Sequence, residues 1–504
     1  MYSYLKALIN AGAEVFEVGG TVRDRLLERP TKDKDYLIRK LDVKQICQIL
    51  EPFGKVALVG QFFGVIKFTP FQKRELTVDF SLPRKEYSTG LGHRDFDVKF
   101  DPMLPVIEDL GRRDFTINAM AYNIQTEELL DPFFGQKDLK NKLLRQVFDK
   151  AFIEDPLRML RGIQFAARFN LKIEDQTLLA MQEQASKITT VSAERIAEEI
   201  KKLFLAQHPS VGFELMAKTK LLSQIFPELA ALRGISQDKQ PGEDVYDHTM
   251  RVLDAASSDL AIDNRGNINL LFAALLHDIG KASTSRYHEP SERIVFFGHQ
   301  AASARMARKI LKRLKVENIG VDIETVLTLI KNHMFETKAF YSDKAIRRFI
   351  HKIGKDLILL LIDLRLADNR GGKHPNSIKG VQKLRKRIIE EIERKPPFGP
   401  KDLAINGKDI MQLGVAQGPF IGQIQKQLIE VVLDDPGLNT KEHLLALVAN
   451  LRDNSAHGAT DSTHNKGKVS QTKKKVDKTS SHKSKKIKKN LSAQQGKSKQ
   501  QKEN

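Results

Sequence analysis

Two carboxylates near the N-terminus, Asp33 and Asp35, have a spacing that suits divalent-metal chemistry. They precede an apolar run, Tyr36 to Ile38, which favours a strand. Because residues two apart in a strand share a face, both side chains would point the same way. Two anions this close repel each other unless a cation lies between them, and Mg²⁺ prefers one or two carboxylates together with substrate phosphates. The pair therefore predicts a Mg²⁺ site for phosphoryl transfer.

The elements before this pair would hold a triphosphate beside it. Glu14 to Val18 alternate polar and apolar residues and predict a strand, which Gly19-Gly20 then breaks. Thr21 to Glu28 predict a helix that Arg29-Pro30 closes, so the turn before it would offer main-chain N–H groups to phosphates. By themselves, a DxD pair and a Gly-Gly turn are common on protein surfaces and carry little information.

The complete string, GGTVRDRLLERPTKDKD, resembles the active-site motif of class II tRNA nucleotidyltransferases and bacterial poly(A) polymerases. The resemblance implies that Asp33 and Asp35 are catalytic and hold Mg²⁺, and that Gly20 and Arg23 bind the nucleotide. A further carboxylate, Asp79, lies in the alternating segment LTVDF. It would be either a third metal ligand that faces the pair or an ordinary residue at a strand end.

A second motif, RRDFTINA, begins about 80 residues after the carboxylate pair. Arginine suits triphosphate oxygens because its planar fork donates hydrogen bonds in pairs. An RRD triplet alone is usually a surface charge cluster. The whole motif, however, resembles the second motif of the same family, which implies that Arg113 contacts the incoming nucleotide.

A third motif, EDPLRMLR, opens a predicted helix with Asp155 as N-cap and Pro156 at the first position. Asp155, Arg158 and Arg161 are spaced by three and would lie along one side, either as a solvated salt bridge or as a reader of a nucleobase edge. Leu157, Leu160, Ile163 and Ala167 would form the buried stripe. The resemblance implies that Asp155 and Arg158 act as a protein template for C and A, with Arg161 nearby. Many relatives have an arginine where this chain has Gln164.

Two further strings complete the family pattern. In ERIAEE, the resemblance implies that Glu194 and Arg195 brace the template helix. The other string, LLHDIGK, places an adjacent histidine and aspartate at the end of an apolar helix, where two buried ionisable groups need a partner such as a metal.

The order H…HD…D resembles the HD superfamily of metal-dependent phosphohydrolases. It implies a divalent metal, of an identity that the sequence leaves open, and the implied ligands are His248, His277, Asp278 and Asp368. His299 and His333 could complete a second metal position. Relatives with an intact HD site have cyclic phosphodiesterase, phosphatase or 2′-nucleotidase activity, whereas others have degenerate, purely structural sites.

Composition restricts the remaining possibilities. The chain has 504 residues, a formal net charge of +20 and one cysteine, Cys47, which excludes an internal disulfide framework and favours a reducing cytoplasm. No apolar run is long enough to span a membrane, and the N-terminus does not have the pattern of a signal peptide. Residues 453–504 hold 14 Lys against 3 Asp and 1 Glu, so half of the excess charge lies there. This segment is expected to be disordered, either binding RNA phosphates or only aiding solubility.

The predicted fold class is α+β, with a nucleotidyltransferase head that has a small mixed sheet, followed by mostly helical domains. The predicted domains are the head at 1–145, a neck with the template helix at 146–235, an HD domain at 236–395, a small tRNA-contacting segment at 396–452 and the tail at 453–504. Within the head, strands are predicted at Val56–Val65, Val78–Phe80 and Ala119–Ile124, and a mobile loop that helps to choose the nucleotide is predicted at Arg84–Pro102.

The predicted function is the addition of C, C and A from CTP and ATP to tRNA 3′ ends in the cytoplasm, together with a metal-dependent phosphohydrolase activity of the HD domain, and without a stable protein partner or a membrane. Alternatives are a poly(A) polymerase, a CC-specific or A-specific enzyme and, from other classes, an HD phosphohydrolase or an RNA-binding protein with an inactive head.

Overall fold

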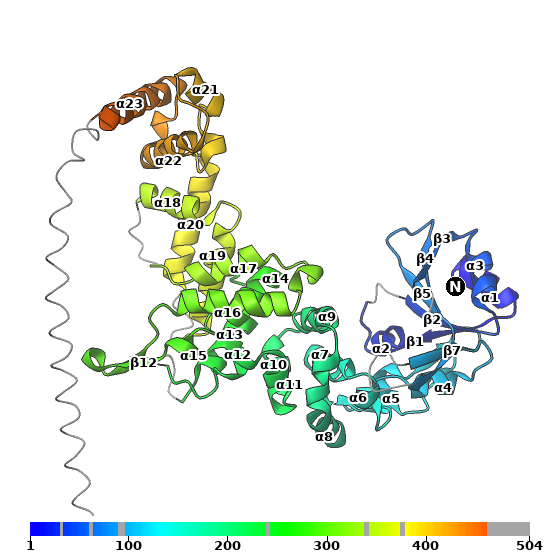
Figure 1. Ribbon diagram of the computed structural model, residues 1–504. Coiled ribbons are helices and arrows are strands. Elements are labelled where there is room, and N and C mark those ends of the chain that lie inside the picture. Colours follow the sequence, from blue (N-terminus) through cyan, green and yellow to red (C-terminus); the bar gives the residue numbers. More distant parts are fainter. Residues whose placement is uncertain are drawn as a thin grey trace, which may run out of the picture. The chain divides into compact units, whose positions relative to one another are not determined.

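The computed structural model describes residues 1–30, 34–59, 64–88, 96–237, 242–336, 342–372 and 378–460. The chain forms two compact units, one of Met1–Phe340 with Ile353–Ile389 and one of Tyr341–Lys352 with Glu390–Asn504. The first unit begins with a seven-stranded mixed sheet and continues as helices, whereas the described part of the second is helical (Figure 1). The predicted α+β class is confirmed.

The sheet of the first unit has the strand order β3-β4-β5-β2-β1-β8-β9. In it β2 and β5 run parallel, and the other described neighbours pair antiparallel. The bounds are β1 (Glu14–Val18), β2 (Lys34–Arg39), β3 (Gly54–Val59), β4 (Val65–Pro70), β5 (Val78–Ser81), β8 (Ala121–Asn123) and β9 (Leu129–Leu130). The helix α2 (Gly20–Leu26) connects β1 to β2 and begins and ends slightly earlier than predicted.

The sheet is buried on both faces, and the period of two along β2 decides what each face carries. Tyr36 and Ile38 belong to a core formed with α1 and α3, whereas Leu37 belongs to a second core formed with α4. Asp35 lies on the same face as Leu37. The helices are α1 (Ser3–Asn10), α3 (Val43–Leu50) and α4 (Val106–Gly111).

Three predictions for the head differ from the structure. The single strand predicted at Val56–Val65 is wrong, because β3 and β4 are separate antiparallel strands, and Gly64 has a φ of 54° before β4. Ala119–Ile124 is only partly a strand, since a 3₁₀ turn (Thr116–Asn118) precedes β8. The segment predicted as a loop contains the antiparallel pair β6 (Arg84–Ser88) and β7 (Phe96–Phe100), and residues 89–95 lie outside the described residues.

After the head, the first unit is mostly helical, as predicted. Two short strands, β10 (Leu143–Leu144) and β11 (Lys172–Ile173), form a parallel pair beside the template helix. The helices of this stretch are α5 (Gly135–Lys140), α6 (Ala151–Glu154), α7 (Leu157–Phe169), α8 (Asp175–Gln184), α9 (Ala193–Leu203), α10 (Pro209–Lys218), α11 (Leu221–Ile225) and α12 (Pro227–Ala230).

The HD segment follows as a set of packed helices. A small hairpin, β12 (Arg286–His288) and β13 (Arg293–Val295), interrupts them. The helices are α13 (Val245–Ser258), α14 (Ile268–Leu276), α15 (Lys281–Thr284), α16 (His299–Arg313), α17 (Ile323–Asn332), α19 (Ile358–Arg370) and α20 (Lys379–Glu393). The seven residues of α14 from Leu270 to Leu276 are all buried, so this helix forms the centre of the segment.

The second unit has its own apolar core. Ile410, Val432 and Leu444 are among its buried members, and the buried Arg347 contacts Glu391 at 2.9 Å. Its helices are α18 (Asp343–Ile353), α21 (Gly407–Gln412), α22 (Pro419–Asp434) and α23 (Lys441–Thr460). The first eight residues of the predicted tail therefore belong to α23, and 461–504 lie outside the described residues. None of the described helices is long and apolar enough to cross a membrane.

Candidate functional sites

The predicted Mg²⁺ carboxylates fall at the start of β2. Asp33 lies outside the described residues, and Asp35 is the second residue of the strand. The parallel register of β2 and β5 places Asp35 opposite Asp79. The main-chain N–H of Asp35 donates to Thr21 Oγ1 at 3.0 Å, which ties the strand to the start of α2.

Asp79 has the surroundings of a metal ligand. Its Oδ1 is buried without a hydrogen-bond partner, and its Oδ2 lies 3.6 Å from Lys67 Nζ. A buried carboxylate oxygen without a partner is rare and costs free energy. A divalent cation bound between Asp35 and Asp79 would satisfy it, so these residues fit Mg²⁺.

Two guanidinium groups lie close to the Gly19-Gly20 turn. Gly19 has a φ of 63°, and a Cβ at this position would lie 2.7 Å from Arg113 NH1. A Cβ at Gly20 would lie 3.5 Å from Arg23 NH2. Arg23 is itself buried and donates to Asn118 Oδ1 at 2.8 Å and to Asp24 Oδ1 at 2.7 Å. The structure therefore brings Gly20, Arg23 and Arg113 together.

A buried carboxylate, Asp109, holds the arginines of the second motif. Arg112 NH2 and Arg113 NH2 lie 2.5 and 3.2 Å from its oxygens. Burial raises the pKa of Asp109, but the two guanidiniums outweigh this effect and hold the pKa below its usual value. Sequence reasoning missed Asp109, although its spacing of three and four from the arginines is the signal of a shared helical face.

The helix α7 contacts the head through two of the predicted nucleotide-binding residues. Arg158 NH2 donates to the carbonyl of Arg112 at 2.9 Å, and Arg161 Nε donates to Asp114 Oδ2 at 2.9 Å. Burial raises the pKa of Asp114, but Arg161 and then a hydrogen bond from Asn118 lower it below its usual value. The second and third motifs therefore form one cluster.

The carboxylate of Asp155 makes two contacts that fix the start of α7. Oδ1 accepts from the Leu157 N–H at 3.1 Å, and Oδ2 accepts from Arg195 NH2 at 2.7 Å. Arg195 thus braces the template helix, whereas Glu194 pairs with Lys315 instead. The predicted apolar stripe is buried except at its last member, Ala167, which is half-buried.

Six histidine and aspartate side chains converge in the HD segment, from α13, α16 and α19 and from the residues that directly follow α14 and α17. They fall into two groups whose potential ligand atoms lie within 4.8 Å of one another: His248, His277 and Asp368, and Asp278, His299 and His333. Asp278 connects the groups, since its Oδ2 lies 3.1 Å from His277 Nε2 and its Oδ1 lies 3.3 Å from His299 Nε2. Every predicted HD residue is therefore in one cluster.

Hydrogen bonds orient all four imidazoles toward the centre of this cluster. The Nδ1 atoms of His248, His277, His299 and His333 lie 2.7 or 2.8 Å from main-chain carbonyls, so each Nδ1 carries the proton. Each Nε2 then presents a lone pair inward. The Nε2 atoms of His299 and His333 are 3.4 Å apart, and His277 Nε2 is buried without a hydrogen-bond partner.

Burial, with His277 beside it, lowers the pKa of His333 to about 3, so this ring stays neutral. Four inward-facing imidazole lone pairs beside two carboxylates form a donor set that fits a transition metal or Zn²⁺.

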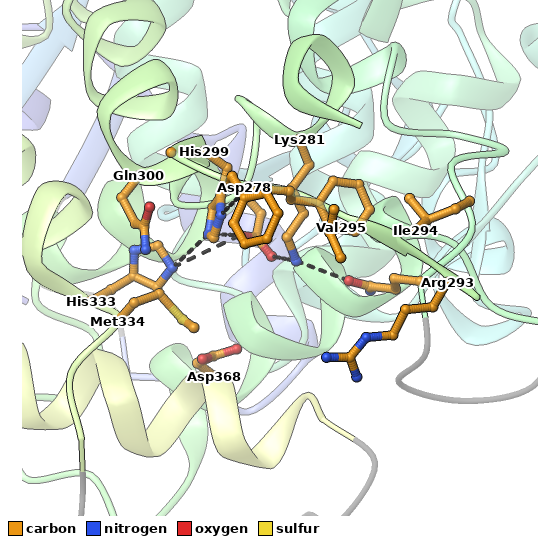
Figure 2. A pocket seen from close by; sticks show the side chains of 14 residues that line it. Asp278, Lys281, Arg293, Ile294, Val295, His299, Gln300, His333, Met334 and Asp368 are labelled. Carbon is orange, nitrogen blue, oxygen red and sulfur yellow. Dashed lines mark hydrogen bonds and ion pairs between the residues drawn. The ribbon is translucent and has the colours of Figure 1, made fainter. Parts of the chain in front are cut away.

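A cavity of about 400 Å³ opens onto this cluster. Figure 2 shows Asp278, Lys281, His299 and His333 close together at one side of the cavity. Lys281 Nζ donates to Asp278 Oδ2 at 2.7 Å and to Gln237 Oε1 at 3.0 Å. Residues 293–298, from β13 to the start of α16, also line the cavity. Lys281 and Gln237 are functional candidates that sequence reasoning did not assign.

Comparisons with known proteins agree with this arrangement. Residues 15–145 match the family described as "Poly A polymerase head domain", residues 170–232 match "Probable RNA and SrmB- binding site of polymerase A", and residues 245–393 match "HD domain". The fold is similar to the CCA-adding enzyme of Bacillus stearothermophilus, solved in complex with CTP. Their TM-score is 0.64 at 22% identity, over 90% of this chain and 97% of that one. The Thermotoga maritima CCA-adding enzyme complexed with tRNA_CCA has a TM-score of 0.53 at 21% identity, over 89% of this chain and 94% of that one.

Curated relatives are closer in sequence. The multifunctional CCA protein of Actinobacillus pleuropneumoniae serotype 5b (strain L20) is 36% identical over 327 residues, which are 64% of this chain and 75% of the relative. That of Haemophilus influenzae (strain PittGG) is 33% identical over 371 residues, 71% of this chain and 85% of the relative. The chain therefore belongs to the family of multifunctional CCA proteins, nucleotidyltransferases that carry an HD domain.

Proposed function

We propose that this chain adds C, C and A, from CTP and ATP, to the 3′ end of tRNA without a nucleic-acid template. The observation that supports this most directly is the pair Asp35 and Asp79 on adjacent strands, next to a glycine turn that two arginines approach. Relatives named multifunctional CCA proteins, and CCA-adding enzymes solved with CTP, ATP or tRNA, support the same substrates.

The aspartates and the arginines of the head have different roles at the triphosphate. Asp33 and Asp35, with Asp79, would hold Mg²⁺, which when bound neutralises phosphate charge and lowers the pKa of the attacking 3′-hydroxyl. Arg23 and Arg113 bind the triphosphate beside Gly20, where the absence of a side chain leaves room. Their charges stabilise the pyrophosphate as it leaves.

The neck helix selects the base. Asp155 offers carboxylate oxygens and Arg158 offers guanidinium N–H groups, so together they complement the acceptor and donor edges of C and A. Arg161 lies beside them and adds positive charge toward the triphosphate. Arg195 holds Asp155, and two main-chain carbonyls hold Arg158. These two base-contacting side chains are therefore in position before the nucleotide binds.

The test is incorporation of each labelled nucleotide into tRNAs that end before, within and after CCA. We expect C, then C, then A, and we expect Asp35→Ala to abolish addition while tRNA binding persists. Substantial residual transfer by Asp35→Ala would contradict the metal assignment. Long A tracts would identify a poly(A) polymerase, and addition of C alone or A alone would identify a specialised enzyme.

A second activity, hydrolysis of a phosphate ester at the HD cluster, is supported by the inward-facing lone pairs of its four histidines. His248, His277, Asp278 and Asp368 would hold a divalent metal, joined by His299 and His333, and the metal would supply an activated water. Lys281 lies at the cavity wall, where its charge neutralises the phosphate that is attacked.

Hydrolysis of a 2′,3′-cyclic nucleotide tests this site. His277→Ala should abolish hydrolysis and leave nucleotide addition intact, whereas His443→Ala, on an exposed position of α23, should change neither. Persistence of hydrolysis in His277→Ala would contradict the ligand assignment, and metal analysis of the wild-type protein identifies the ion. A cytoplasmic location is part of the proposal, because the single cysteine suits a reducing compartment.

A further inference from the structure

Three guanidinium groups gather around the ring of Phe169, at the end of α7. The Cζ atoms of Arg23, Arg29 and Arg168 lie 4.4, 4.9 and 5.3 Å from the centroid of this ring. Cation–π attraction explains why each guanidinium is near the ring. This attraction does not explain why three guanidinium groups share one ring, because like charges repel each other.

The described residues supply little countercharge to this cluster. Asp24 is occupied by Arg23, through hydrogen bonds of 2.9 and 2.7 Å. Glu199 contacts Lys202 at 2.8 Å and Arg161 at 3.7 Å. Within the described part of the chain, the guanidinium of Arg29 makes no ion pair or hydrogen bond. Among the described residues, no carboxylate forms an ion pair with Arg29 or Arg168, although Asp24 and Glu199 lie close enough to Arg168 to raise its pKa in part.

Arg168 is oriented by a neutral group. Its NH1 donates to Gln164 Oε1 at 3.0 Å, and this amide is buried, so it directs the guanidinium without neutralising it. Burial lowers the pKa of Arg168, and its neighbours Arg23 and Arg29 lower it further. The helix dipole favours a cation in the last turn of α7, which accounts for Arg168. It does not account for Arg23 and Arg29, which come from α2 and the segment after it.

We propose that Arg29 and Arg168 form a second anion site, which binds one backbone phosphate of the RNA strand that is extended. This inference rests on the proposed transfer to tRNA. Arg23 lies between this site and the Gly19-Gly20 turn, where Arg113 serves the triphosphate. Arg29 is exposed and Arg168 half-exposed, so a long chain can reach them, whereas Arg23 is buried. Two planar forks suit phosphate oxygens and read no base.

The test compares the double variant Arg29→Gln/Arg168→Gln with the wild-type full-length protein. The double variant loses charge-assisted hydrogen bonds to the RNA phosphate but none to the incoming nucleotide. The KM for tRNA should therefore rise roughly tenfold, while kcat and the KM for CTP should not change. Loss of one neutralised phosphate should also reduce the slope of log K for tRNA against log salt by about 0.7.

Two variants serve as controls. Arg25→Gln removes a charge from α2, close in sequence to Arg29, but this arginine has its own partner, Glu17 at 3.1 Å, so the KM for tRNA should not change. Arg29→Lys/Arg168→Lys keeps both charges and should restore the salt slope. An unchanged KM for tRNA in the Gln double variant would overturn the proposal, and so would a rise confined to the KM for CTP.

The failure of this inference can be distinguished from failure of the proposed function. If the wild-type protein incorporates no nucleotide, transfer to tRNA is wrong, yet equilibrium binding of tRNA still tests the anion site through its affinity and salt slope. Equal tRNA affinity and slope for the wild type and the Gln double variant would then exclude it.

Discussion

Gly19 shows how the position of an arginine depends on an absent side chain. A Cβ there would lie 2.7 Å from Arg113 NH1, and the φ of 63° is unfavourable for any residue with a Cβ. We expect Gly19→Ala to raise the KM for CTP, because Arg113 must move away from the turn. Steady-state incorporation at varied CTP measures this effect.

A matched glycine separates the displaced arginine from backbone strain. Gly12 has a φ of 94° and no atom within 4 Å of an added Cβ. Gly12→Ala should lose about 1–2 kcal/mol of unfolding free energy, as Gly19→Ala also should, but keep the wild-type KM for CTP. A similar rise in KM in both variants would show that strain alone is responsible.

At the scale of elements, α9 (Ala193–Leu203) positions the base reader on α7. Arg195 contacts Asp155 at 2.7 Å. Arg195→Met should therefore leave the Asp155 carboxylate without a fixed orientation and increase incorporation of GTP or UTP relative to CTP. The pair is partly exposed, so the unfolding free energy should fall by at most about 1 kcal/mol. Competition between labelled nucleotides measures the selectivity.

Glu194 provides the control on the same helix. It pairs with Lys315 rather than with α7, so Glu194→Gln should leave selectivity unchanged. If Arg195→Met also keeps wild-type selectivity, the brace is structural only and the proposed role of Asp155 in base choice loses its support.

At the scale of the molecule, the HD cluster couples metal binding to stability. Four inward lone pairs and two carboxylates are brought together only in the folded state, so a bound ion should stabilise that state, by about 2.7 kcal/mol at a hundredfold excess over Kd. We expect a chelator to lower the melting temperature and re-added metal to restore it. Differential scanning calorimetry of the wild type and of His277→Ala, which should not respond, checks this expectation.

The net charge of the chain is also distributed unevenly. All 14 lysines of residues 453–504 lie beyond Thr460, the last residue of α23. Truncation after Thr460 should therefore weaken binding to RNA of any sequence, with a difference that shrinks as salt increases. Filter binding at two salt concentrations tests this, and equal affinities at low salt would favour a solubilising role.

The sequence by itself determined the family, the α+β class and the residues of the HD cluster, because these depend on local strings with specific spacing. It also placed the start of α7 to within one residue, since an Asp-Pro pair acts on its own helix, although Pro156 rather than Asp155 is the N-cap. It misjudged Val56–Val65 and Arg84–Pro102, where apolar and charged runs have no strong periodicity and strand pairing is settled by distant partners.

Tertiary structure decided which side chains meet. Asp79 lies opposite Asp35 because β2 and β5 pair in parallel, a register that no local signal contains. Arg29, Arg168 and Gln164 share one cluster because Phe169, at the end of α7, contacts the segment after α2. Asp114 contacts Arg161 across 47 positions. Burial makes these contacts matter, since a charge or lone pair that is harmless in water needs a partner inside the fold.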